Sequence, residues 1–198
     1  MTDLVNALEQ RGFIVRSFQT GSEARDFLLA SISPAQSVGI GGSMTIREIG
    51  AAEALRERGN TVYWHWDTPG AQTRLAAHGA DVYLCSCNAI TRDGQLVYID
   101  GTGNRVGALI AGPTEAYVVA SLSKAVDGGL NTAIARTKRE SCPRNARRLK
   151  LDTPCGKTGL CKPEACGEDC MCRTIVALSR PGRGRKLTVV LVEEPLGY

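Results

Sequence analysis

The architecture of this chain follows from residues 38–60, VGIGGSMTIREIGAAEALRERGN, where a short apolar strand passes through a glycine-rich loop into a helix. Val38-Gly39-Ile40 has the length and apolar character of a buried strand. Beyond Gly41-Gly42-Ser43, apolar residues recur at helical spacing, and Gly59-Asn60 ends the helix. A buried strand that leads directly into an amphipathic helix is typical of α/β folds.

The same alternation recurs along the rest of the chain. β-branched and aromatic residues predict strands at 13–18, 61–66, 81–87 and 116–120, and helical patterns lie between most of them. The strand at 116–120 is continuously apolar, as expected inside a parallel sheet. We therefore predict a single α/β domain, residues 1–198, with a mostly parallel sheet flanked by helices.

Two hairpins are also expected. Asp93-Gly94 is a strong two-residue turn signal between the apolar residues on either side of it, which predicts a hairpin over residues 89–99. Near the end of the sequence, the runs 174–178 and 187–192 flank a glycine-rich turn that begins at Pro181. This second pattern predicts a C-terminal hairpin.

The composition limits the class of protein. The hydrophobic share of 43% and the charged share of 22% are ordinary for a globular domain, and no apolar run approaches the roughly 20 residues of a membrane span.

The net charge of +4 is concentrated between Arg136 and Lys150, where no aromatic residues are interleaved. We interpret this cluster as a solvated helix face and expect no nucleic-acid partner. Met1-Thr2-Asp3-Leu4 does not resemble a secretion signal, so a cytoplasmic location is expected.

Residues 153–173, TPCGKTGLCKPEACGEDCMCR, hold five of the eight cysteines. This cysteine-rich loop has few large apolar side chains, so a metal held by thiolates is expected to order it. A disulfide-linked loop and plain structural thiols are the alternatives, and disulfides require an oxidising compartment. Cys142 is a possible substitute ligand, and we interpret Cys85 and Cys87 as core thiols. The candidate ligands are Cys155, Cys161, Cys166, Cys170 and Cys172.

The spacing of these cysteines matches neither a standard zinc ribbon nor a ferredoxin. Only Met171 separates Cys170 from Cys172, and binding of both to one zinc ion would strain a tetrahedral chelate. A cluster with separate irons tolerates less regular spacing. The pattern therefore favours a [4Fe-4S] cluster, with zinc as the alternative.

Two polar loops follow expected strands. Gly41, Gly42, Ser43 and Thr45 lie where a strand becomes a helix, a position suited to an anion or to a simple capped turn. The second loop, Asp100-Gly101-Thr102-Gly103-Asn104-Arg105, combines a carboxylate, a hydroxyl, an amide and a guanidinium. It suits a polar ligand or acid–base chemistry, although an ordinary Asp-Gly turn also explains it. His65 and His78 belong to no triad pattern, so we interpret them as strand packing and surface residues.

Several short motifs together resemble the lactate utilization (LUD) domain family. They are Gly41-Gly42-Ser43 with Glu48-Ile49-Gly50, Asn88-Ala89-Ile90-Thr91, the stretch from Asp100 to Val106, Asn145-Ala146 with Arg148-Leu149, and Thr153-Pro154-Cys155 with Thr158-Gly159 and Cys161. In this chain the gap from Cys161 to Cys166 is longer than the family pattern, and Cys170 is additional.

The resemblance implies a fold like that of the ribose-5-phosphate isomerase and coenzyme A transferase class, whose ligands lie above two such loops. It adds Glu48 and Asn88 to the expected ligand-binding residues Gly41, Gly42, Ser43, Thr45, Thr102, Gly103, Asn104 and Arg105. It also implies an iron–sulfur accessory or electron-transfer component of lactate (2-hydroxy acid) oxidation that works with other subunits.

An alternative is a stand-alone enzyme that binds a phosphorylated or coenzyme A-like anion at the two loops. Asp100 is then the expected acid–base group, and Ser43, Asn104 and Arg105 position the anion. The sequence pairs no nucleophile with a base, which favours the accessory role.

Overall fold

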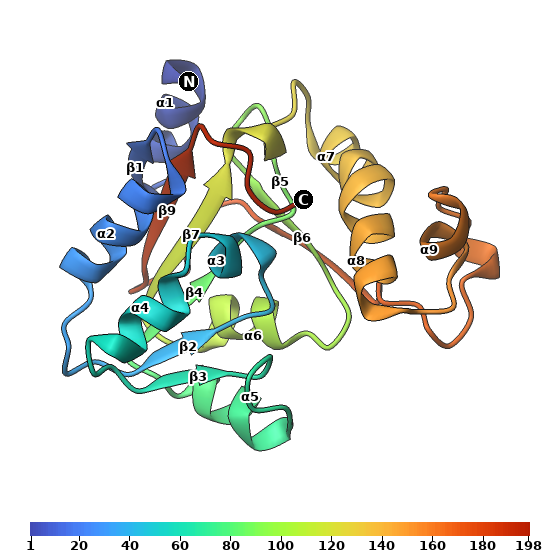
Figure 1. Ribbon diagram of the computed structural model, residues 1–198. Coiled ribbons are helices and arrows are strands. Elements are labelled where there is room, and N and C mark those ends of the chain that lie inside the picture. The colour runs from blue at the N-terminus through green and yellow to red at the C-terminus, as the bar shows by residue number, and fades with distance from the viewer.

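The computed structural model describes residues 1–198 as a series of alternating strands and helices (Figure 1). The first half of the chain contains α1 (Thr2–Gln10), β1 (Ile14–Phe18), α2 (Gly21–Ser31), β2 (Val38–Ile40), α3 (Met44–Glu48), α4 (Ala51–Glu57), β3 (Val62–Trp64) and α5 (Ala71–His78). The second half contains β4 (Val82–Cys85), β5 (Ala89–Ile90), β6 (Leu96–Asp100), α6 (Asn104–Ala111), β7 (Glu115–Ser121), η1 (Leu122–Lys124), α7 (Leu130–Arg136), η2 (Thr137–Ser141), α8 (Cys142–Leu149), α9 (Pro154–Thr158), η3 (Pro163–Ala165), β8 (Thr174–Leu178) and β9 (Lys186–Val192). None of these helices has the length and apolar character that a membrane-spanning segment needs.

Six strands form a parallel sheet in the order β1-β9-β7-β4-β2-β3. The central strands β4 and β7 are buried on both faces, which explains their continuously apolar sequences. The predicted α/β class with a parallel sheet flanked by helices is confirmed. Because the strands are parallel, the loops after β2, β4 and β7 all leave the same edge of the sheet.

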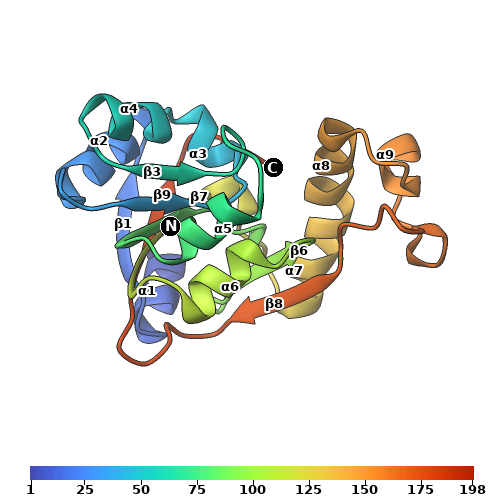
Figure 2. The ribbon, with the colours of Figure 1, turned by 90° about the horizontal axis from the view of Figure 1, so that it is seen from below.

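Each face of this sheet is covered by its own set of helices (Figure 2). Alternate residues of a strand point to opposite faces, so Val82 and Leu84 pack beneath α2, α3 and α4. Tyr83 and Cys85 belong to the other layer, with α1, α5, α6 and the small sheet. The predicted core thiols Cys85 and Cys87 are both buried in that second layer.

A second sheet is antiparallel and has the order β5-β6-β8. The predicted hairpin across Asp93-Gly94 is confirmed by β5 and β6. The predicted C-terminal hairpin is wrong, because β8 pairs with β6 whereas β9 enters the large sheet between β1 and β7. The reason is burial: β9 is buried along nearly its whole length and β8 is only partly covered, so the two strands suit different sheets.

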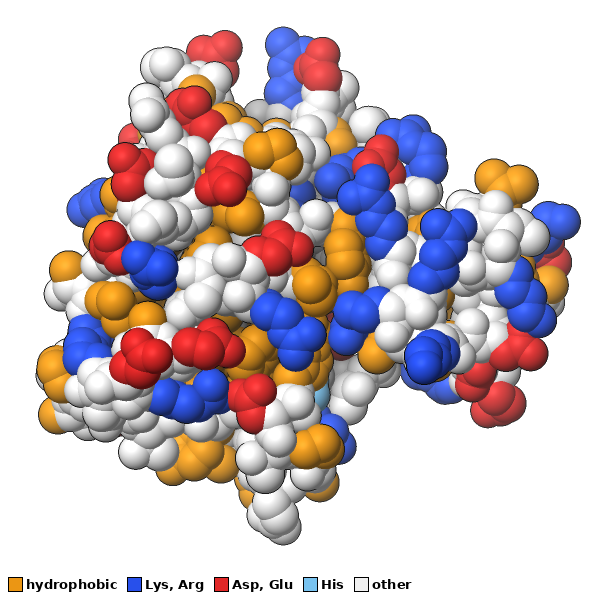
Figure 3. All heavy atoms as spheres, in the orientation of Figure 1, with side chains coloured by type: hydrophobic (Ala, Val, Ile, Leu, Met, Phe, Trp, Pro, Cys, Tyr) orange, Lys and Arg blue, Asp and Glu red, His pale blue; other side chains and the backbone are white.

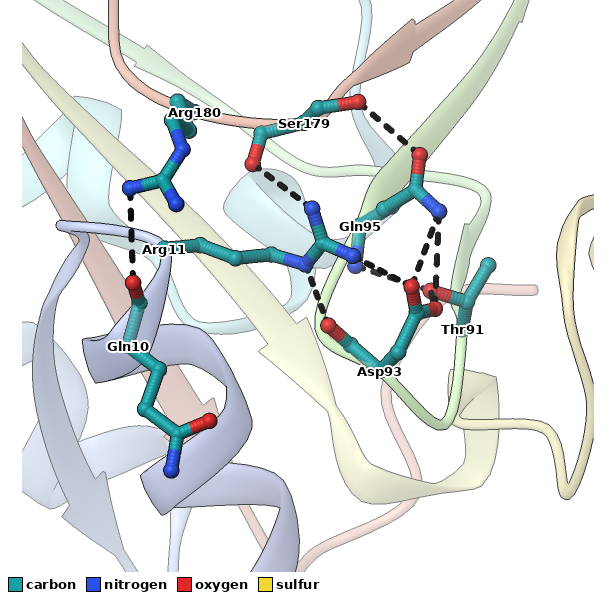
Figure 4. A network of polar contacts seen from close by, with 7 residues as sticks. All are labelled: Gln10, Arg11, Thr91, Asp93, Gln95, Ser179 and Arg180. Atoms are coloured by element: carbon teal, nitrogen blue, oxygen red, sulfur yellow. Dashed lines mark hydrogen bonds and ion pairs between the residues drawn. The ribbon is translucent and has the colours of Figure 1, made fainter.

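The turns at one end of the small sheet are tied to α1 by a polar network (Figure 4). The guanidinium of Arg11 bonds to Asp93 and donates to the carbonyl of Ser179 at 3.2 Å. Gln95 donates to the same carboxylate and accepts from the hydroxyl of Ser179 at 2.9 Å. This network anchors β8 to the hairpin of the small sheet, away from β9.

Helix α7 continues through the π-helical turn η2 into α8, so residues 130–149 form one continuous helical segment. Pro143 at the start of α8 has no N–H to donate, and the change of helical register falls directly before it. Figures 1 and 2 show α8 and α9 to one side of the large sheet, with α9 outermost. The cysteine-rich loop therefore projects from the α/β body.

Candidate functional site

A cavity of about 360 Å³ lies between the carboxyl edge of the large sheet and helix α8. Of its 24 lining residues only eight are hydrophobic, so it suits a hydrophilic ligand. Figure 3 shows Lys and Arg side chains gathered between α3 and α8 and over α8. The polar and charged lining residues include Ser43, Thr45, His65, Ser86, Asn88, Asp100, Thr102, Asn104, Arg105, Lys124, Ser141, Asn145, Arg148 and Tyr198.

The first predicted loop forms one wall of the cavity through Gly42, Ser43 and Thr45. Ser43 caps α3 by accepting a hydrogen bond from the backbone N–H of Ile46 at 3.1 Å. A Cβ atom on Gly42 would lie 3.2 Å from Nε1 of Trp66, so glycine lets the indole approach the loop. Gly41 lies outside the lining, where its carbonyl accepts from Nε1 of Trp64 at 3.2 Å.

The second predicted loop forms another part of the wall through Asp100, Thr102, Asn104 and Arg105. Asp100 accepts from the N–H of Gly103 at 3.2 Å and from Nε of Arg105 at 3.4 Å. Gly103 itself lies in a separate shallow hollow rather than in the cavity. The structure thus brings together the two loops that the sequence analysis singled out.

The two residues that the family resemblance added have different positions. Asn88 lines the cavity, and its side-chain oxygen accepts from Nη2 of Arg105 at 2.9 Å and from the N–H of Ile99 at 3.0 Å. Glu48 is outside the lining and accepts from the N–H of Gly197 at 2.6 Å. Asn88 therefore holds the Asp100 loop in place, and Glu48 holds the C-terminal segment.

The deepest cationic group in the cavity is Lys124, in the turn η1 after β7. Its Nζ donates to Oγ1 of Thr45 and to Oγ of Ser86, both at 2.8 Å. Its side chain is only 2% exposed, and no carboxylate pairs with it. Burial lowers the pKa of Lys124 to about 8.

The rim of the cavity is aromatic and cationic. Trp66 lies close to two guanidinium groups, with Cζ of Arg47 at 4.8 Å and Cζ of Arg148 at 4.4 Å from its ring centre. Arg148 also bonds to Asn145 and to the hydroxyl of Tyr198. Residues from the body, α8 and the C-terminal segment therefore meet at this rim.

The interpretation of Arg136–Lys150 as a solvated face is only partly correct. Arg144 and Arg147 are exposed, but Arg136 is buried. Its guanidinium donates to the carbonyl of Asn88 at 2.9 Å and to Oγ of Ser141 at 3.1 Å. Sequence periodicity does not reveal that one arginine of this basic run is buried and forms hydrogen bonds inside the protein.

Both histidines lie near the polar loops. His65 lines the cavity just beyond β3 rather than packing within that strand, and burial lowers its pKa. His78 is half-buried at the end of α5, and its Nε2 lies 2.7 Å from the carbonyl oxygen of Asn104. Neither histidine forms a hydrogen bond with a hydroxyl or thiol that would act as a nucleophile.

The cysteine-rich loop contacts the cavity wall at Cys142 of helix α8. This residue lines the cavity, and its Sγ lies 3.4 Å from Sγ of Cys172. The shared hydrogen bond raises the pKa of Cys142 and lowers that of Cys172 to about 7. All eight cysteines are free thiols. No group of three or more His, Cys, Asp or Glu side chains is arranged to hold a metal ion.

Five cavity residues were not predicted from the sequence: Lys124, Ser86, Trp66, Asn145 and Tyr198. Lys124 and Ser86 were within reach of the same reasoning as the two loops, because each follows an apolar strand of the parallel sheet. Trp66 lies just beyond β3, another strand of this sheet, but Tyr198 carries no comparable signal. Tyr198 reaches the cavity through a C-terminal segment whose course depends on the complete fold.

Fold and site together define an α/β protein with a polar, cationic cavity at the carboxyl edge of its sheet. A family model described as the LUD domain matches residues 1–192. The chain therefore belongs to the LUD domain family, which is associated with lactate utilization.

A solved structure is similar along nearly the whole chain: the crystal structure of a DUF162 family protein from Deinococcus radiodurans. Its TM-score is 0.53 and its sequence identity is 13%, over 96% of this chain and 94% of that chain. At this identity the likeness shows the fold alone. No protein with a curated description matches the sequence. The likeness to the ribose-5-phosphate isomerase and coenzyme A transferase class stays a prediction.

Proposed function

We propose that this LUD domain protein is an iron–sulfur-carrying accessory or electron-transfer component of a cytoplasmic 2-hydroxy acid oxidation system of the lactate type. The observation that carries the proposal is the contact between Cys142 of the cavity wall and Cys172 of the cysteine-rich loop, at 3.4 Å between sulfurs. A redox centre in this loop would lie beside any ligand in the cavity. A short distance between the two would favour electron transfer.

The proposed ligands are drawn from Cys155, Cys161, Cys166, Cys170 and Cys172, with Cys142 as a further donor. A donor set made only of sulfur suits a [4Fe-4S] cluster or zinc and does not suit magnesium or calcium. When bound, a cluster would supply one-electron transfer. The 3.4 Å separation is close to the edge of about 3.8 Å in a ZnS₄ tetrahedron with Zn–S bonds of about 2.3 Å, so zinc is the competing occupant.

The exposure of this loop supports a role with partner subunits. Between residues 153 and 173 only Thr153 and Cys155 are buried. Leu160 is 65% exposed, and Cys161 beside it is exposed as well. A thiol-rich loop on the outside of the molecule allows a bound cluster to approach a second redox protein.

Purification under anaerobic conditions, followed by metal analysis and visible absorption, tests the cluster. We expect a brown protein with about four irons per chain, and a Cys155→Ser variant that loses most of them. The matched control is Cys85→Ala, which changes a core thiol remote from the loop and should keep its iron. A colourless protein with one zinc ion per chain would contradict the cluster proposal.

A second candidate is a stand-alone enzyme, favoured by the convergence of the two loops on one cavity. Asp100 would be the acid–base group, and Ser43, Asn104 and Arg105 would position the anion. The volume of 360 Å³ is at the low end of the roughly 300–1,000 Å³ of small-molecule sites. A sugar phosphate suits this volume better than coenzyme A, which would enter only by its thiol end. Turnover of a sugar phosphate without any partner would favour this candidate over the accessory role.

A further inference from the structure

Three neighbouring strands deliver one polar side chain each to the floor of the cavity. Thr45 follows β2, Ser86 follows β4 and Lys124 follows β7, and these strands are adjacent in the sheet. The hydroxyls of Thr45 and Ser86 are 3.3 Å apart, and Nζ of Lys124 is 2.8 Å from both. The three groups form a compact cluster at the carboxyl edge of the sheet.

The positive charge in this cluster has no negative partner within the protein. Lysine has three N–H donors, and only two of those on Lys124 find an acceptor. The nearby carboxylate of Glu48 is held by the N–H of Gly197 at 2.6 Å and forms no ion pair with Lys124. Because a buried charge without a partner is costly, the site is poised to accept an anion.

The other cations of the cavity differ in this respect. Arg105 pairs with Asp100, and its remaining donors bond to Ser86, Asn88 and Ile99. Arg136 is held by backbone carbonyls and a hydroxyl. Lys124, on the floor of the cavity, is therefore shielded from bulk solvent but lines the cavity, and one of its N–H donors has no acceptor. At the rim, Arg148 adds a second cation that pairs with no carboxylate.

The C-terminal segment encloses the lysine. A Cβ atom on Gly197 would lie 2.4 Å from Oγ1 of Thr45 and 3.1 Å from Nζ of Lys124, so the backbone passes directly over the cluster. Tyr198 then reaches across to Asn145 and Arg148 of α8. This cover removes the cluster from bulk water, which strengthens its attraction for an anion.

We infer that Lys124, together with Thr45 and Ser86, binds the oxyanion of a small hydroxylated ligand, either a carboxylate or a phosphate. The oxyanion would take up the unused donor of Lys124, and the hydroxyls and amides of the cavity wall would bind the rest of the ligand. The inference rests on the proposed use of this cavity as a ligand site and does not depend on the metal. Both the accessory role and the enzymatic role would use the same anchor.

Titration of the anaerobically purified full chain with L-lactate, inorganic phosphate and ribose 5-phosphate tests the inference. Binding is followed by calorimetry and by the fluorescence of the chain's two tryptophans, Trp64 and Trp66, of which Trp66 lines the cavity. Lactate distinguishes the carboxylate from the two phosphate ligands, and neutral lactamide controls for charge. We expect at least one oxyanion to bind and lactamide to bind at least about 10-fold more weakly than lactate if lactate is that ligand.

The diagnostic variant is Lys124→Met, which keeps the length of the side chain and removes its charge. It should weaken binding of the oxyanion by about 10- to 100-fold, as expected for loss of a charge-assisted hydrogen bond. Lys186→Met is the matched control, since Lys186 is exposed at the start of β9 and pairs with Glu115. This control should bind like the wild type. Ser86→Ala provides a second, milder variant if Lys124→Met fails to fold, with binding weakened several-fold.

Equal oxyanion affinity in the wild type and Lys124→Met would overturn the inference, as would failure of the wild type to bind any of the three oxyanions. The iron content of each variant is measured as well, because it tests the proposed redox role independently of anion binding. Lys124→Met should keep its metal while losing anion binding, and Cys155→Ser should show the reverse. Loss of iron without loss of oxyanion binding would agree with the inference that Lys124 binds the oxyanion.

Discussion

The α/β body and the cysteine-rich loop are ordered by different forces. The body contains two hydrophobic clusters of 19 and 18 buried residues, one on each face of the large sheet. The loop from residue 153 to residue 173 buries only Thr153 and Cys155. Its local order comes from short turns, including the capped helix α9 that begins after Thr153.

The two regions therefore have different roles: the body provides the stability of the fold, and the loop carries most of the thiols. Burial of apolar surface stabilises the body by roughly 25 cal/mol per Å², and the loop has little such surface to bury. The proposed metal would supply the stability that apolar burial does not give this loop. The cavity lies between the two regions and has walls from both. Each prediction below alters one region and compares the result with a control position.

The largest effect on global stability is expected from the core of the body. Leu84 of β4 is fully buried, and replacement by alanine should lower the free energy of unfolding by about 3 kcal/mol. Leu160→Ala in the exposed part of the loop should change it by less than about 0.5 kcal/mol. Urea denaturation followed by circular dichroism measures both. Similar losses for the two variants would show that the loop shares the core of the body.

The next effect concerns the buried lysine and depends on pH. The pKa of Lys124 in the folded protein, about 8, is below its ordinary value of 10.5, so between these values the unfolded chain holds a proton that the folded chain has lost. Without ligand, the wild type should therefore gain about 2 kcal/mol of stability relative to Lys124→Met between pH 7 and pH 9.5. The charged or titratable groups that face Lys124 are Glu48, Cys87, Arg105 and Arg136, and both proteins retain them.

Urea unfolding of both proteins across this pH range measures the difference. Comparison with Lys124→Met removes the shared titration of buried tyrosines and thiols, such as Tyr83 and Cys85, whose pKa values burial raises. A difference that is independent of pH would mean that Lys124 has an ordinary pKa in the folded protein.

A smaller effect is expected from the segment that covers the cavity. Gly197 has a φ of 63° and leaves no room for a Cβ atom beside Thr45 and Lys124, so Gly197→Ala should displace residues 193–198. We expect a loss of about 1 kcal/mol, faster hydrogen exchange in that segment and weaker oxyanion binding. Gly184→Ala is the control, since Gly184 has a similar φ of 75° with no atom near the added Cβ. Weaker oxyanion binding in both variants would indicate that backbone strain alone is responsible.

The smallest effect on the body should follow removal of the proposed metal. Chelation of the anaerobically purified protein should accelerate hydrogen exchange across residues 153–173 and change the free energy of unfolding of the body by less than about 0.5 kcal/mol. Hydrogen exchange with mass spectrometry reports both regions in one experiment. The reference peptide is β7, which lies in the centre of the large sheet. Unfolding of β7 after chelation would show that the metal supports the entire domain.

Much of the fold was predictable because the pattern of apolar residues along a strand indicates how that strand is buried. The continuous apolar run at 116–120 predicted a strand inside a parallel sheet, and β7 lies there. The turn at Asp93-Gly94 predicted the β5–β6 hairpin. The last two strands were assigned wrongly, because nearness in the sequence suggested a pairing that the two sheets do not use.

The candidate site was partly predictable for the same reason. Strand-to-loop transitions at Gly42 and Asp100 indicated two parts of the cavity. Gly42 follows β2 of the parallel sheet and Asp100 ends β6 of the small antiparallel sheet, so the packing of the two sheets brought them together. Lys124 lies at a third such transition but carries no glycine-rich signal. The burial of Lys124 is a property of the assembled cavity, so no local pattern could reveal its lowered pKa.

The sequence by itself determined the α/β class, the family motifs and the concentration of thiols in residues 153–173, because these depend on composition and short-range periodicity. Only the tertiary structure decided that β9 enters the large sheet and that Cys142 meets Cys172. It also decided that Lys124 is buried without a negative partner. These outcomes depend on contacts between residues far apart in the chain, where the packing of one element sets the surroundings of another.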